Sequence, residues 1–211
     1  MNLAAHIDYT LLDPDAAPVR IDDLCATARV QGYAAVCVLP YHAARAVDRL
    51  ADTGVRIASV VGFPTGDHDL PAKLAQVESL ARAGIDEVDY VIHRPAAAAA
   101  DWDTLEAEAQ AMSQFCREAG LTLKMIVESG HRQAGELERL CQLAVWFSID
   151  YVKTSTGTAA VGARLDDVRH LRQLLPPAVR IKASGGIRDA ETASAFLQAG
   201  ADRIGTSALL P

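Results

Sequence analysis

The chain contains few lysines, because only four of its 20 basic residues are lysine and the rest are arginine. Arginine stays protonated in proteins, whereas a buried lysine can lose its proton and become a nucleophile. We therefore treat each lysine within an apolar run as a candidate functional group, and Lys124, Lys153 and Lys182 fall in such runs. The fourth, Lys73, falls in a helical pattern, and we predict that it lies on the surface.

The chain also lacks basic runs, long apolar runs and a signal-peptide pattern, and each absence argues against a class of protein. The formal net charge is -7 and no basic run occurs, which argues against a nucleic-acid partner. No apolar run approaches the ~18 residues that span a membrane. The first fifteen residues, MNLAAHIDYTLLDPD, lack the basic and apolar regions of a signal peptide, so we expect a cytoplasmic protein.

The spacing of the cysteines does not indicate a redox or metal-binding function. Cys25, Cys37, Cys116 and Cys141 form no C-x-x-C pair and no metal-ligand spacing with histidine. We expect buried free thiols in a reducing compartment, and no metal site.

Short apolar, β-branched runs alternate with amphipathic stretches along the whole chain. The predicted strands are residues 5–10, 34–39, 56–63, 87–93, 122–128, 151–155, 179–183 and 203–206. The predicted helices are residues 19–31, 41–53, 71–83, 102–119, 135–147, 164–175 and 189–199. The alanine-rich residues 96–100 are expected to lead into the helix that begins near Trp102.

This alternation indicates parallel strands and an α/β fold. Eight such units predict a (β/α)8 TIM barrel that occupies residues 1–211 as a single domain. The alternative is a doubly wound open sheet, which normally carries a glycine-rich turn after its first strand. No such turn follows Thr10.

Four neighbouring predicted strands each place one ionisable group among apolar residues: Asp89, Lys124, Lys153 and Lys182. In a barrel, alternate side chains point inward and active sites gather where the strands end. A purely structural ion-pair network is the alternative. Three lysines beside one aspartate leave an excess of positive charge, which such a network would not favour. We therefore expect a functional site.

The two lysines on the sixth and seventh strands could generate a nucleophilic amine together. An unperturbed lysine, with a pKa near ~10.4, is almost entirely protonated at neutral pH. A second ammonium ~5 Å away costs roughly 3 kcal/mol at an effective dielectric of ~20, or a little over two pKa units. Partial burial could add about one more unit. We thus expect Lys182 to lower the pKa of Lys153.

Glycines follow the last two predicted strands. Gly185 and Gly186 precede the helix that begins near residue 189, and Gly205 precedes Thr206 and Ser207. Backbone amides in these two loops commonly bind phosphate in barrels of this kind. Glycine pairs also occur in tight turns with no ligand, and that alternative remains.

Several segments resemble the deoxyribose-phosphate aldolase family. The most specific are VKTSTG at residues 152–157 and KASGGIR at 182–188, and further matches run from IDYTLL at 7–12 to RIGTS at 203–207. The resemblance covers nearly the whole chain. It implies a cofactor-free, metal-free class I aldolase that reversibly joins acetaldehyde to D-glyceraldehyde 3-phosphate, with small aldehydes and sugar phosphates as its partners.

The resemblance also implies a role for each matching residue. Lys153 would form the Schiff base, Lys182 would lower its pKa, and Asp89 would transfer protons with Lys182 and an ordered water. The remaining assignments are Lys124 in the same polar network, Asp8, Thr10 and Cys37 along the pocket, and Gly157, Gly185, Gly186, Gly205 and Ser207 at the phosphate. Barrels of this kind often pair, so a homodimer is also expected.

Three features depart from the family pattern. His93 stands where asparagine is common, Thr158 replaces a larger or basic residue, and the chain ends at Pro211, without a tyrosine-bearing tail found in some relatives. From Thr158 and the missing tail we predict a lower rate or a weaker preference for phosphorylated substrates.

Three other functions remain open at this point. One is a different lysine aldolase or transaldolase with another donor. The second is a phosphate-sugar isomerase or synthase that forms no imine. The third is a barrel that only binds its ligand, which the presence of both Lys153 and Lys182 disfavours.

Overall fold

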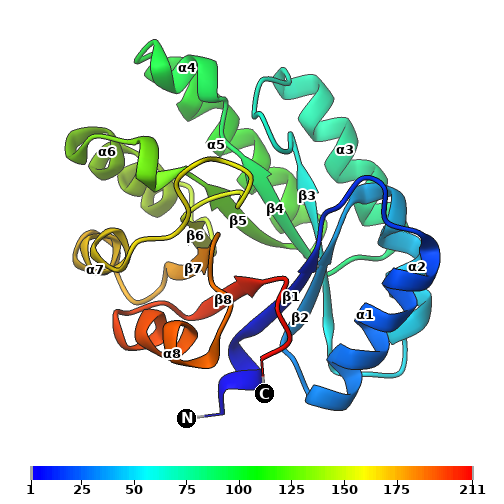
Figure 1. The fold of residues 1–211 in the computed structure, drawn as a ribbon. Helices are drawn as coiled ribbons and strands as arrows, with labels where there is room; N and C mark the ends of the chain where they lie inside the picture. Colours follow the sequence, from blue (N-terminus) through cyan, green and yellow to red (C-terminus); the bar gives the residue numbers. More distant parts are fainter. Residues whose placement is uncertain (1, 211) are drawn as a thin grey trace.

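Eight parallel strands pair in sequence order and close into a barrel, because β8 pairs with β1 as well as with β7 (Figure 1). The computed structural model describes residues 2–210. The strands are β1 Ile7–Leu11, β2 Ala35–Val38, β3 Arg56–Val61, β4 Glu87–Val91, β5 Thr122–Ile126, β6 Tyr151–Lys153, β7 Arg180–Ser184 and β8 Arg203–Thr206. The predicted (β/α)8 barrel is thus confirmed.

Helices surround the strands on the outside (Figure 1). They are α1 Pro18–Gln31, α2 Ala43–Leu50, α3 Leu70–Ala83, α4 Arg94–Ala98, α5 Trp102–Glu118, α6 Ala134–Trp146, α7 Leu165–Leu174 and α8 Ala190–Gln198. Three short 3-10 helices are η1 Leu3–His6, η2 Pro40–His42 and η3 Ser129–His131. The apolar faces of the α-helices and the outward side chains of the strands form the main core, which is mostly aliphatic.

The alanine-rich stretch differs from its prediction. It forms the separate helix α4, whose first turn contains Pro95 and whose N-terminus is capped by His93 Nδ1, which accepts from Ala96 N at 3.1 Å. Ala100 then adopts a left-handed φ of 54°, and the Asp101 side chain caps α5. Pro95 favours the start of α4, and the Asp101 cap favours a separate start for α5. The chain therefore turns between the two helices instead of forming one.

The position of Lys73 was predicted wrongly. Its side chain lies on α3 but is fully buried, and Nζ forms an ion pair with Glu108 Oε1 on α5 at 2.5 Å. The sequence did carry a signal for this, because Lys73, Val77 and Leu80 follow the spacing of one helix face, and all three are buried.

The barrel interior has two unlike halves. Inward side chains of β2 and β3 form a small apolar cluster of Cys37, Ala58 and Val60, against which Phe63 packs. The strands from β4 to β7, together with β1, instead contribute buried charged groups, and β8 adds the partly exposed Arg203. This division places charge on one side of the barrel axis and apolar surface on the other.

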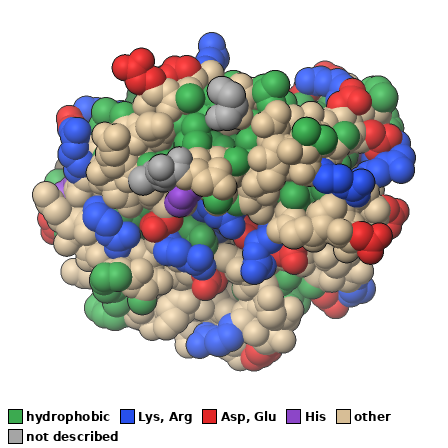
Figure 2. All heavy atoms as spheres, turned by 90° about the horizontal axis from the view of Figure 1, so that it is seen from below, with side chains coloured by type: hydrophobic (Ala, Val, Ile, Leu, Met, Phe, Trp, Pro, Cys, Tyr) green, Lys and Arg blue, Asp and Glu red, His purple; other side chains and the backbone are tan. Residues whose placement is uncertain are grey.

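The outer surface is mixed in character. On the face shown in Figure 2, basic and acidic side chains are interspersed rather than gathered by sign. No helix within residues 2–210 is both long enough and apolar enough to cross a membrane. All four cysteines are buried free thiols, as predicted.

Candidate active site

Asp89 lies at the centre of the buried charged groups. Its Oδ1 contacts Lys124 Nζ at 2.7 Å, and its Oδ2 contacts Lys153 Nζ at 2.7 Å and Lys182 Nζ at 2.8 Å. The carboxylate is fully buried, and Lys153 is only 2% exposed. The four residues that the sequence singled out on β4 to β7 therefore meet at one carboxylate.

A second tier of charged residues lies beneath them. Lys182 Nζ also contacts Asp8 Oδ2 at 2.5 Å, and Lys124 Nζ contacts Glu87 Oε2 at 2.6 Å. Arg203 bonds Asp8 and lies 3.3 Å from Glu87. Glu87 and Arg203 were missed in the sequence. Each stands two positions before an inward residue of its strand, Asp89 and Gly205, so strand alternation could have identified both.

We call these seven side chains the barrel network: Asp8, Glu87, Asp89, Lys124, Lys153, Lys182 and Arg203. It combines four basic groups with three carboxylates. A buried net charge is costly, so the network is balanced when one amine is neutral. Lys153 is the best candidate, because Asp89 is its only carboxylate contact among the described residues, whereas Lys124 and Lys182 each contact Asp8 as well.

The pKa directions agree with that assignment. Burial, followed by the like charge of Lys182, lowers the pKa of Lys153 against the opposing pull of Asp89. Burial also disfavours charge on Lys182, but Asp8 and Asp89 outweigh it and raise the pKa of Lys182 well above its usual range. Burial by itself would raise the pKa of the Asp89 carboxyl. Lys124, Lys153 and Lys182 outweigh it and hold that pKa well below its usual range.

These directions refine the expected cause. From the sequence we expected the ammonium of Lys182 to cause most of the lowering of the Lys153 pKa, and burial the smaller part. In the folded chain, burial is the larger cause and Lys182 adds to it. The site thus places Lys153, an amine of lowered pKa, beside Lys182, whose pKa is raised.

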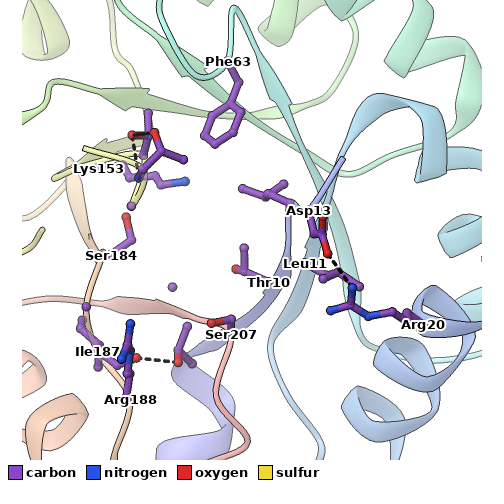
Figure 3. A pocket seen from close by; sticks show the side chains of 18 residues that line it. Thr10, Leu11, Asp13, Arg20, Phe63, Lys153, Ser184, Ile187, Arg188 and Ser207 are labelled. Atoms are coloured by element: carbon purple, nitrogen blue, oxygen red, sulfur yellow. Dashed lines mark hydrogen bonds and ion pairs between the residues drawn. The ribbon is translucent and has the colours of Figure 1, made fainter. Parts of the chain in front are cut away.

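A cavity of about 370 Å³ opens above the barrel network (Figure 3). Seven of the predicted site residues line it: Thr10, Lys153, Gly157, Gly185, Gly186, Gly205 and Ser207. Figure 3 shows Lys153 entering from β6 and the ring of Phe63 pointing into the same space. The cavity therefore gives a ligand access to the amine.

The other predicted site residues are buried and do not line this cavity. Asp8, Asp89, Lys124 and Lys182 belong to the barrel network. Cys37 was expected along the pocket, but its side chain is fully buried. Burial, followed by the charge of Asp89, raises the pKa of the Cys37 thiol, which keeps it in its less reactive form.

The glycines form the opposite end of the cavity from Phe63. Gly157, Gly185 and Gly186 have φ values of 82°, 99° and 82°, in the left-handed region that glycine favours. A Cβ on Gly185 would lie 2.5 Å from Ser155 Oγ, whereas one on Gly186 would meet open space. The loop backbone can thus approach a ligand closely.

The N-terminus of α8 contributes less than expected to this end. The Asp189 carboxylate already accepts from Thr192 N at 2.7 Å and caps the helix. A phosphate would instead meet the backbone of the loop before the cap, where Gly185 and Gly186 line the cavity. Two cavity-lining cations, Arg188 on that loop and Arg20 on α1, were missed in the sequence.

Arg20 and the two family departures have clear local roles. Arg20 Nη1 contacts Asp13 Oδ2 at 2.6 Å at the cavity rim (Figure 3). Thr158 lines the cavity, and its hydroxyl lies 3.0 Å from that of Thr156. His93 serves as the cap of α4.

Within residues 2–210, no group of three or more His, Cys, Asp and Glu side chains is arranged to hold a metal ion. The cavity instead combines a buried amine of lowered pKa with an amide-rich, cationic end. Such an arrangement suits covalent capture of a carbonyl compound that carries an anionic group.

Comparison with known proteins agrees with this chemistry. Residues 6–210 match the family model described as DeoC/LacD family aldolase. A deoxyribose-phosphate aldolase of Brevibacillus brevis is 40% identical over 98% of this chain and 93% of its own. The crystal structure of a candidate deoxyribose-phosphate aldolase of Coccidioides immitis superposes with a TM-score of 0.94 at 34% identity, covering 98% of this chain and 82% of that one. A tetrameric deoxyribose phosphate aldolase of Aeropyrum pernix gives a TM-score of 0.90 at 31% identity, covering 97% and 86%.

Proposed function

Because this chain belongs to the DeoC/LacD family of aldolases, we propose that it reversibly cleaves 2-deoxy-D-ribose 5-phosphate to D-glyceraldehyde 3-phosphate and acetaldehyde. The observation that carries the proposal is the unequal treatment of two neighbouring lysines. Lys153 reaches the cavity with a lowered pKa, while Lys182 is held as an ammonium beneath it. An imine-forming enzyme needs this division between nucleophile and proton donor.

In the cleavage direction, the Lys153 amine attacks the aldehyde carbon of the open-chain sugar. Loss of water then gives a protonated imine, which acts as an electron sink. Removal of the C3 hydroxyl proton breaks the C2–C3 bond, and the electron pair moves to form an enamine as the phosphorylated aldehyde leaves. Protonation of C2 and hydrolysis of the imine release acetaldehyde and restore Lys153.

We assign proton transfer in these steps to Asp89 and Lys182. Asp89 stays ionised in the charged surroundings of the barrel network, so it can accept a proton or hold the water that does. Lys182 stays protonated and shares the Asp89 Oδ2 atom with Lys153, which makes it the nearest acid to the imine nitrogen. Lys124 keeps the other Asp89 oxygen in place.

The phosphate would lie at the glycine end of the cavity. Gly157, Gly185, Gly186, Gly205 and Ser207 are the proposed binding residues, with backbone amides and a hydroxyl as donors. Arg188 supplies positive charge from the same loop. The weaker phosphate preference predicted from Thr158 remains a prediction, and equal kcat/KM values for phosphorylated and free deoxyribose would support it.

A cytoplasmic location and a homodimer also belong to the proposal. Four buried free thiols suit a reducing compartment. The tetrameric relative supports self-association in general, and sedimentation analysis of the purified chain distinguishes monomer, dimer and tetramer. The assignment of residues 1–211 to one domain is supported by the closed barrel.

Borohydride reduction in the presence of acetaldehyde tests the mechanism. We expect mass spectrometry to find one ethyl group on Lys153, and Lys153→Ala to lose retro-aldol activity by at least about 10⁴-fold. Lys153→Arg is the matched control, since it retains a long basic side chain that cannot form the imine. Absence of an adduct would leave an isomerase or synthase, and an adduct formed only with ketones would indicate a different donor.

A further inference from the structure

The ion pair between Lys73 and Glu108 lies outside the barrel and plays no part in the proposed chemistry. Besides Glu108, Lys73 Nζ donates to the carbonyl oxygens of Gly66 at 3.2 Å and Val91 at 2.8 Å. The second oxygen of Glu108 accepts from His93 N at 2.8 Å. All three ammonium donors and both carboxylate oxygens are therefore engaged.

One of these contacts, from Lys73 Nζ to the carbonyl of Gly66, holds the loop that follows β3. Gly66 lies in this loop, and a Cβ on Gly62 at its start would lie 2.7 Å from Lys73 Cε. Gly62 N also donates to Gln76 Oε1 on α3 at 2.9 Å, and Gly66 N donates to Gly62 O at 2.7 Å. The loop is thus fastened to α3 at both ends.

Phe63 stands between the two fastened glycines. As far as the described residues go, it is the only cavity-lining side chain contributed by the half of the barrel from β2 to β5. Its ring points into the cavity that Lys153 enters (Figure 3) and packs on the apolar cluster of Cys37, Ala58 and Val60. The space between Phe63 and Lys153 is where carbons attached to the imine would lie.

We propose that Lys73 and Glu108 are positioning residues that hold Phe63 opposite Lys153 and thereby limit the size of the donor aldehyde. This inference rests on the proposed Schiff-base function. A fixed wall can discriminate against one extra methyl group by roughly 10–200-fold, and a displacement of about 1 Å at a reacting centre can change rates by as much. A loosened loop would relax that discrimination.

A charged pair is suited to this task for a physical reason. The carbonyl of Gly66 belongs to the loop after β3 and that of Val91 to the end of β4, and both accept from the buried Lys73 amine. One ammonium can satisfy both and still bond Glu108, whereas an apolar side chain would leave the two carbonyls without partners. The pair therefore fixes the distance between the loops after β3 and β4.

The test is the double variant Lys73→Met/Glu108→Gln. It buries no charge, keeps an amide oxygen for His93 N and removes the donors to Gly66 and Val91. We expect the ratio of kcat/KM for propanal over acetaldehyde, as donors to D-glyceraldehyde 3-phosphate, to rise about tenfold. Borohydride adduct formation with acetaldehyde should persist. Gln76→Ala, which releases Gly62 alone, should shift the ratio in the same direction by less.

Two further measurements separate positioning from general loosening. In a Phe63→Ala background the double variant should no longer change the donor ratio, because both changes act through the same ring. Ser113→Ala removes a different buried bond of α5, from Ser113 Oγ to Phe147 O at 2.5 Å, and should lower thermal stability while leaving the ratio unchanged.

The outcomes are distinct from those of the mechanism test. If the wild type forms no Lys153 adduct, the proposed function itself fails. If the wild type is active but neither the double variant nor Gln76→Ala changes the donor ratio, the positioning role is wrong. A change in ratio that persists unaltered without the Phe63 ring, or that Ser113→Ala reproduces, overturns it equally.

Discussion

The molecule buries lysines in two places, and the two clusters differ in charge balance. In the barrel network four basic groups face three carboxylates, and the cluster opens onto the cavity through Lys153. The Lys73–Glu108 pair is balanced one to one, and all its polar atoms have partners. Both are hidden from solvent, so burial alone does not separate chemistry from architecture.

The difference shows what makes a buried amine reactive. Burial lowers the pKa of Lys73 as it does that of Lys153, but Lys73 has a carboxylate partner of its own and no second ammonium beside it. An unbalanced cluster can lower its energy by releasing a proton from its least stabilised member, here Lys153. In this fold the excess of one cation thus distinguishes the cluster to which we assign catalysis from the evenly paired one to which we assign support.

Removal of Lys182 should have the largest effect on this comparison. Lys182→Met leaves three basic groups with three carboxylates, so Lys153 should remain an ammonium bound to Asp89. We expect activity near neutral pH to fall about 10²–10³-fold, and the acid limb of kcat/KM to move to higher pH by about one unit or more. Steady-state rates across pH check this.

Lys73→Met is the control for that shift, because it removes a buried lysine from the balanced pair and should leave the acid limb in place. An equal loss for Lys182→Met at every pH, with no shift, would mean that Lys182 carries protons without setting the pKa of Lys153.

Breaking the balanced pair should mainly affect stability. Lys73→Met leaves the Glu108 carboxylate buried without its partner, and we expect the free energy of unfolding to fall by about 3–5 kcal/mol. Lys73→Met/Glu108→Gln should recover part of that loss, since no charge remains buried although the Gly66 and Val91 carbonyls lose their donor. Urea unfolding of the three proteins measures both steps, and a double variant as unstable as the single one would contradict this account.

Acid should weaken the barrel network through Asp8. The pKa of its carboxyl is lowered from 3.8 to about 2, because Lys182, Lys124 and Arg203 outweigh its burial. A depressed pKa in the folded state means that the stabilisation is complete above the unfolded pKa and is lost as pH falls toward about 2. We expect a loss on the order of 2 kcal/mol between about pH 5 and pH 2 from this residue.

Urea midpoints measured through that range test the assignment. Asp8→Asn should be less stable than the wild type near neutral pH, and the difference should narrow as the acid protonates Asp8. A constant difference at all pH values would exclude Asp8 as a source of the acid sensitivity.

The smallest effect is expected at the exposed Asp13–Arg20 pair. Arg20→Gln removes a cation from the cavity rim, and we expect KM for 2-deoxyribose 5-phosphate to rise about threefold through weaker, solvent-screened attraction. Free deoxyribose should be unaffected. Arg29→Gln on the same helix lies away from the cavity and serves as the matched control. Equal changes for both sugars would remove Arg20 from phosphate recognition.

Much of the site followed from local patterns. Strand alternation placed Asp89, Lys124, Lys153 and Lys182 on the inward faces of four successive strands, and the structure brings all four together. The same rule would have identified Glu87 and Arg203, had it been applied to the whole of β4 and to β8. These side chains were predictable because a parallel barrel keeps the order and parity of its strands.

Other features depended on segments distant in sequence. Lys73 was assigned to the surface because it falls in a helical pattern, and the carboxylate that accompanies its burial lies 35 residues away on another helix. Cys37 is buried in a cluster with Ala58 and Val60 of the neighbouring strand, against which Phe63 packs. No pattern around either residue specifies these partners.

The sequence by itself determined the barrel and the set of lysines within it, since both follow from periodicity along the chain. Only the tertiary structure decided which lysine is free to react. That choice depends on Asp8 reaching Lys182 and Arg203 when the first strand pairs with the last, across 195 positions of sequence. Ring closure brings those charges together, and the energy of charge in a buried space then depends on how many neighbours of each sign are within reach.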